Sequence, residues 1–93
     1  MTDEALSEAV IAYVWGDRSQ PWPSRRPDAL TEVQRVYLAA IEAIIATAFS
    51  VEPTAPTLAS LGDEAAAAVR RGHPQLSPGA LDAIGNLYAY QWK

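Results

Sequence analysis

The sequence predicts an all-α protein, a compact bundle of about four helices in one domain that covers residues 1–93. Three observations support this prediction. Apolar residues recur at helical spacing in four segments, glycine and proline separate those segments, and the apolar residues are dominated by alanine, the strongest helix former. The content of 49% hydrophobic and 19% charged residues is typical of a globular chain rather than a disordered one. We expect helices at approximately 3–15, 28–50, 58–71 and 78–91.

The first predicted helix covers residues 3–15. Thr2 is positioned to cap its start, and Gly16 is a typical stop after its last turn. Its apolar residues follow a helical period, so they form one stripe that faces the core. The stripe consists of Leu6, Ala9, Val10, Tyr13 and Val14.

The second predicted helix is the longest and covers residues 28–50, with Asp28 as its N-cap. Between Ala39 and Phe49 only Glu42 and Thr47 are polar. A helix that is apolar nearly all round is expected to be buried nearly all round. We therefore expect this helix at the centre of the bundle or in the seam of a dimer.

The third predicted helix covers residues 58–71 and starts at Thr57 or Ser60, both of which are good capping residues. The fourth covers 78–91, with Ser77 as its cap and Pro78 at its first position. Gly85 in the middle of the fourth helix suggests a close contact with a neighbouring helix. Aromatic residues alternate near the chain end, so a short strand over 86–92 is an open alternative.

Composition limits the classes of function. The seven basic residues are outnumbered by eleven acidic ones, and the net charge of −4 disfavours binding to nucleic acid. The most apolar window, 36–51, is short for a membrane span and contains Glu42, so we expect no membrane insertion. The chain contains no cysteine and its first residues are acidic, which favours a cytoplasmic protein. The bias towards alanine and arginine is typical of a bacterial genome rich in GC.

No catalytic or cofactor motif is present. His73 is the single histidine, it lies between Gly72 and Pro74, and no companion ligand stands at metal-binding spacing. The glycines do not match a phosphate-binding loop. We therefore predict no enzyme activity, no cofactor and no metal.

The connector 16–27 is the one locally basic part of this acidic chain. It holds Trp22 between Pro21 and Pro23, which keep that segment extended. Trp22 either folds onto the core as a lid or forms a binding hot spot with the neighbouring arginines. The candidate interaction surface consists of Trp22, Arg25, Arg26, Arg18, Tyr90 and Trp92.

Glu42 is the candidate buried or paired acid, because it stands in the apolar half of the second helix. A buried carboxylate needs a partner, and Arg70 or Arg71 could supply one. The alternative places Glu42 on a solvated stripe, with Arg35 two turns back on the same side.

These observations favour a small non-enzymatic protein–protein interaction module of a regulatory, accessory or inhibitor type. It would bind another protein or a second copy of itself as a homodimer, because its apolar surface is large for so small a core. One alternative is a nucleic-acid-associated regulator that uses a local arginine patch, and another is a helical domain that binds a small ligand near Glu42 and His73. The arginines of that patch would be Arg18, Arg25, Arg26, Arg70 and Arg71.

Overall fold

The computed structural model describes residues 2–16, 22–54 and 56–91. Within these ranges the chain forms α-helices and short 3₁₀ turns and no strand, which confirms the predicted all-α bundle. The elements in chain order are α1 (Glu4–Trp15), η1 (Pro27–Ala29), η2 (Gln34–Tyr37), α2 (Leu38–Phe49), α3 (Leu58–Gly72) and α4 (Pro78–Gln91).

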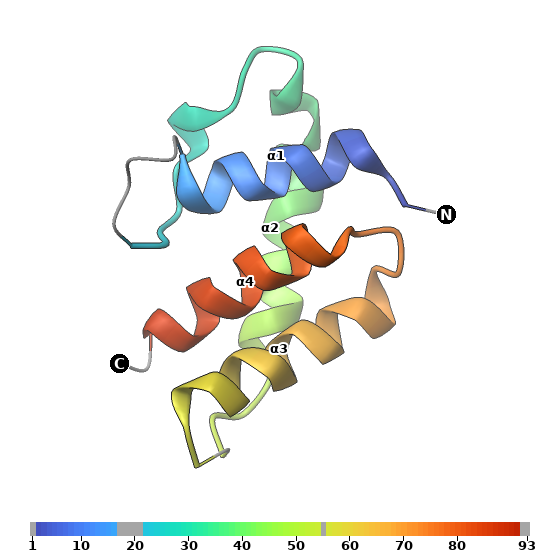
Figure 1. The fold of residues 1–93 in the computed structure, drawn as a ribbon. Helices are drawn as coiled ribbons and strands as arrows, with labels where there is room; N and C mark the ends of the chain where they lie inside the picture. Colours follow the sequence, from blue (N-terminus) through green and yellow to red (C-terminus); the bar gives the residue numbers. More distant parts are fainter. Residues whose placement is uncertain (1, 17–21, 55, 92–93) are drawn as a thin grey trace.

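The helices form two layers of unequal width. In one layer α4 lies between α1 and α3 and contacts both of them (Figure 1). The other layer is α2 alone, which crosses behind the three and contacts α3 and α4. One side of α2 therefore faces the rest of the protein, and no other helix of the described chain lies against its opposite side. None of the described helices combines the length and the apolar character needed to cross a membrane.

Helix α1 begins and ends as its sequence suggests, with one correction. The N-cap is Asp3 rather than Thr2, since the Asp3 carboxylate accepts a hydrogen bond from the Leu6 amide at 3.0 Å. Gly16 ends the helix with a φ of 65°, a conformation that favours glycine. The predicted apolar stripe is buried along its whole length.

The predicted helix over 28–50 is wrong in its first part. Asp28 lies in the turn η1 and caps no α-helix, and Leu30 is extended, with φ −76° and ψ 135°. Thr31 and Gln34 then form a reciprocal capping box: the Thr31 amide donates to Gln34 Oε1 at 3.0 Å, and the Gln34 amide donates to Thr31 Oγ1 at 3.2 Å. Helical structure therefore begins at this capping box with the 3₁₀ turn η2, and the regular α-helix α2 spans only Leu38–Phe49.

Helices α3 and α4 lie close to their predicted ranges. Thr57 Oγ1 accepts from the Ser60 amide at 3.1 Å, and Ser77 Oγ accepts from the Ala80 amide at 3.1 Å. Because α4 continues to Gln91, the strand alternative is wrong for the described part of the chain end. Trp92 lies outside the described residues.

Two glycines set the distance between α3 and α4. A Cβ atom placed on Gly85 would lie 2.8 Å from the carbonyl oxygen of Gly62, and one placed on Gly62 would lie 3.0 Å from that of Gly85. The distance at Gly85 is too short for a side chain against rigid backbone and the distance at Gly62 is tight, so this approach favours glycine at both positions and most strongly at Gly85. The predicted close contact of Gly85 with a neighbouring helix is confirmed.

Two polar contacts of buried side chains join the helices, one within the three-helix layer and one between the layers. Ser7 is buried in α1, and its Oγ accepts a hydrogen bond from the Ser77 amide at 2.9 Å, which anchors the start of α4. The Tyr88 hydroxyl donates to the carbonyl oxygen of Val51, just beyond α2. Around these points the buried apolar core draws on all four helices and includes Val10, Val14, Ile41, Ile44, Val69, Ile84, Leu87 and Tyr88.

Candidate functional site

The connector docks onto the C-terminal end of α1. The Ser24 amide donates to the Val14 carbonyl at 2.9 Å, and the Arg26 amide donates to the Tyr13 carbonyl at 2.8 Å. The last carbonyls of a helix have no partner within the helix itself. The connector therefore completes the end of α1 with its own backbone.

The two adjacent arginines have different roles. The Arg26 guanidinium donates to the Val14 carbonyl and, through Nη2, to the Trp22 carbonyl at 2.9 Å, so it holds the connector in place. Arg25 is exposed, and its guanidinium carbon lies 5.1 Å from the centroid of the Phe49 ring, within the range of a cation–π contact. Arg18, the third arginine of the predicted surface, lies outside the described residues.

Trp22 is not a closed lid over the core. Its side chain is 49% exposed, whereas the adjacent Pro23 is buried. Pro23 lines a hollow of about 230 Å³ with Leu58 and three residues of α4, Asn86, Ala89 and Tyr90. The structure thus brings Pro23 of the connector, Leu58 of α3 and Tyr90 of α4 to one hollow.

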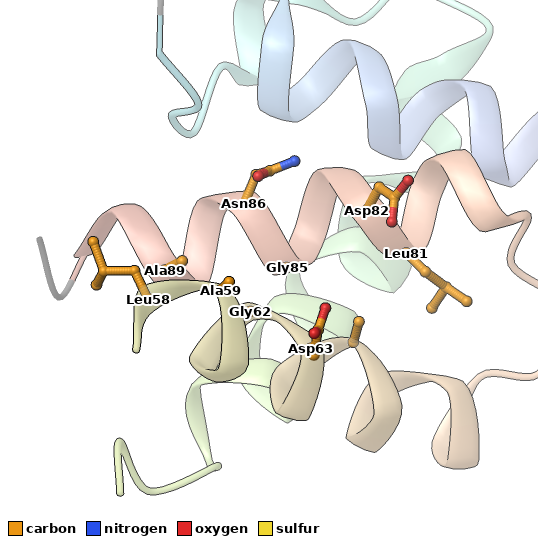
Figure 2. A pocket seen from close by; sticks show the side chains of 10 residues that line it. Leu58, Ala59, Gly62, Asp63, Leu81, Asp82, Gly85, Asn86 and Ala89 are labelled. Atoms are coloured by element: carbon orange, nitrogen blue, oxygen red, sulfur yellow. The ribbon is translucent and has the colours of Figure 1, made fainter. Parts of the chain in front are cut away.

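A groove runs along the contact of α3 with α4 (Figure 2). Its volume is about 320 Å³, and Gly62 and Gly85 line it where the helices come closest. Asp63 and Asp82 line this groove. They also line a second hollow next to it, at the end of α3 and the start of α4. The small residues on both helices are what leave this space open.

The described arginines do not converge on one patch. Arg70 and Arg71 line a hollow with Pro78, at the end of α3 and the start of α4. The connector that carries Arg25 and Arg26 meets the opposite ends of those helices, through the hollow shared with Leu58. From Leu58 to Arg70 the rise along α3 is about 18 Å. The four described arginines of the patch predicted for nucleic acid are therefore divided between two ends of the protein.

The residues suited to acid–base or metal chemistry are dispersed as well. His73 Nε2 lies 3.4 Å from Thr47 Oγ1, a hydroxyl that donates to the Ala43 carbonyl of its own helix. Neither His73 nor Glu42 lines any of the three hollows above. Within the ranges that the structure describes, no three His, Asp or Glu side chains gather as a metal site would require.

Within one chain the second helix is not buried nearly all round, so its predicted place at the centre of the bundle is wrong, and the seam of a dimer stays a prediction. Only the inner side of α2 is buried, through Ile41, Ile44, Ile45 and Ala48. On the opposite side the side chains are exposed, and Val33 and Val36 before the helix are each 77% exposed. The α2 outer face, as we name this surface, consists of Val33, Val36, Ala39, Ala40, Ala43 and Ala46.

Glu42 is exposed at the edge of the α2 outer face, so the solvated alternative describes it and burial does not. Its charge acts on Tyr13 of α1. Burial raises the pKa of the Tyr13 phenol, the positive charge of Arg25 lowers it, and the negative charge of Glu42 raises it further. Arg25 and Glu42 therefore both lie close enough to Tyr13 for their charges to act on its phenol.

The connector, the hollows and the α2 outer face have no counterpart in a known protein that matches this chain. Comparison of the chain with protein-family models, with curated proteins and with solved structures finds no match.

Proposed function

We propose that this chain is a small non-enzymatic interaction module, of a regulatory or accessory kind, that associates with a second copy of itself through the α2 outer face. The observation that carries this proposal is the 77% exposure of Val33 and of Val36, next to a row of exposed alanines on the same side. Cysteine-free composition is compatible with a cytoplasmic location for such a module.

The six apolar residues form a continuous surface. Val33, Val36 and Ala39 are successive neighbours three residues apart, and Ala43 follows Ala39 by four residues, so their side chains lie in one row. Contiguous exposed apolar surface on a soluble domain marks an interaction site more often than scattered apolar residues do. Covering this row would remove apolar area from water, which is the main favourable term in association.

The alanines make the α2 outer face both apolar and flat. A helix surface of small side chains lets another helix approach closely, with its own side chains against the backbone. Glu42 is the only charged residue of α2, and Thr47 uses its hydroxyl within its own helix. The face is therefore suited to another apolar helix rather than to a charged polymer.

Sedimentation equilibrium over a range of protein concentrations tests this proposal. We expect reversible self-association of the wild-type chain and at least about tenfold weaker association of Val36→Lys, because the face would have to bury an ammonium group. Ala67→Lys is the matched control, since it adds the same charge at an exposed position of α3. A wild-type chain that stays monomeric at every concentration would contradict the proposal, and so would equal effects of the two substitutions.

A further inference from the structure

We infer that the two copies meet with their α2 helices antiparallel about a two-fold axis, so that Arg35 of each copy faces Glu42 of the other. This inference rests on the proposed self-association and adds its geometry. It follows from the distribution of charge along the α2 outer face.

Arg35 and Glu42 are the only charged residues between Val33 and Phe49, and both are exposed. Arg35 lies in the turn η2, which leads directly into α2. With three residues per turn in η2 and 3.6 in α2, the two residues differ by about 40° around the axis and by about 12 Å along it. They therefore project from the same flank, with Arg35 four residues before Ala39 and Glu42 between Ala40 and Ala43.

Two-fold symmetry makes this pair informative. In a symmetric dimer, if a residue contacts a second residue of the other copy, the reciprocal contact also forms. With parallel helices the two-fold axis runs along the helices and places this flank of the two copies on opposite sides of the contact, so neither Arg35 nor Glu42 meets a charge of this pair in the other copy. With antiparallel helices both contacts join opposite charges. The charges thus favour the antiparallel arrangement.

The position of the axis agrees with the packing requirement. An antiparallel pairing of residue 35 with residue 42 places the axis level with Leu38 and Ala39. Ala39 and Ala40 are exposed there, and their small side chains permit the closest approach at the crossing. The exposed Val36 of one copy then lies against the alanines of the other, where its apolar area is covered.

Arg25 is a second cation whose charge acts near Glu42 within one copy. A test of the contact between copies must distinguish its effect from that of Arg35. Its guanidinium lies over Phe49, and its charge, like that of Glu42, influences the pKa of Tyr13. The Arg25→Glu variant is therefore the control for effects that Glu42 exerts within one copy.

Charge reversal tests the arrangement. Sedimentation equilibrium would compare the wild type with Arg35→Glu, Glu42→Arg and the double variant. Each single reversal replaces two attractive contacts per dimer with two repulsive ones, so we expect association to weaken about tenfold, with recovery in the double variant. The differences should shrink in about 1 M salt, which screens exposed charges. Circular dichroism of each variant would check that these exposed substitutions leave the helices intact.

Mixing experiments distinguish the two orientations. In an antiparallel dimer, wild type and double variant repel each other at both contacts and each prefers its own kind, whereas parallel helices keep these charges apart and would give the mixed dimer in statistical proportion. Mixing in statistical proportion, single reversals without effect, or an equal loss from Arg25→Glu would each overturn the inference while leaving self-association intact. A wild-type chain that never associates would instead overturn the proposed function, and the inference with it.

Discussion

The contact between α3 and α4 and the outer face of α2 contrast in a way that hydrophobicity alone does not explain. Helix α3 carries four charged residues, yet it packs against α4 with Gly62 and Gly85 in backbone contact. Helix α2 carries only one charged residue, yet one of its sides is exposed to solvent. Shape and available partners decide which surfaces of this protein are covered.

The cause lies in the unequal layers. In the three-helix layer α4 has a neighbour on each side, and glycine lets the backbones of α3 and α4 meet. The second layer contains only α2, so this helix has a partner for its inner side alone. A small domain buries a modest fraction of its surface. An apolar remainder on α2 follows from that geometry.

The two sides of α2 should differ most strongly in their contribution to stability. Ile44→Ala removes a fully buried side chain and should lower the free energy of unfolding by about 3 kcal/mol, because a cavity remains. Val36→Ala on the exposed side should lower it by less than about 0.5 kcal/mol in the monomer. Urea denaturation of both variants measures the difference. Similar losses at low protein concentration would show that the outer face is covered within one chain.

The next largest effect concerns the glycine contact. Gly85→Ala should destabilise the protein by about 1–3 kcal/mol, because the added Cβ lies 2.8 Å from the Gly62 carbonyl oxygen and the helices must separate. Gly79→Ala is the control: its Cβ meets only ordinary contacts, and alanine favours the helix by up to about 1 kcal/mol. If Gly85→Ala were as stable as Gly79→Ala in thermal denaturation, the close approach would not limit the packing.

The smallest expected effect is on the pH dependence of stability, through Tyr13 of α1. Because burial raises the pKa of Tyr13 above its ordinary value of 10.0, the folded state favours the neutral phenol. That contribution to stability is complete below the unfolded pKa and is lost as the pH rises through the folded pKa. We expect the unfolding free energy to fall above about pH 10 and to fall less steeply in Tyr13→Phe. Urea denaturation across the alkaline range would refute this expectation if both proteins showed the same slope.

Much of the fold could be predicted because the signals are local. The period of the α1 stripe, the caps Thr57 and Ser77, and the stop at Gly16 depend on residues a few positions apart. The capping box of Thr31 and Gln34 is equally local, and its pattern of Thr followed three residues later by Gln could have located the restart of the second helix.

The candidate surface was less predictable, because it depends on contacts between distant segments. The two adjacent arginines look equivalent in the sequence, yet Arg26 binds the end of α1 and Arg25 lies over Phe49. Tyr90 and Pro23 come to one hollow from opposite ends of the chain, and Leu58 completes it without any motif. Their proximity exists only after the helices have packed.

The sequence by itself determined that this protein is helical, where most helices begin and end, and that its second helix is apolar nearly all round. Only the tertiary structure decided which side of that helix is covered. Helical period and capping act within a few residues, so they can be read along the chain. Burial of a helix face depends on which other helices pack against it. Here α2 is alone in the second layer and has neighbouring helices on one side only.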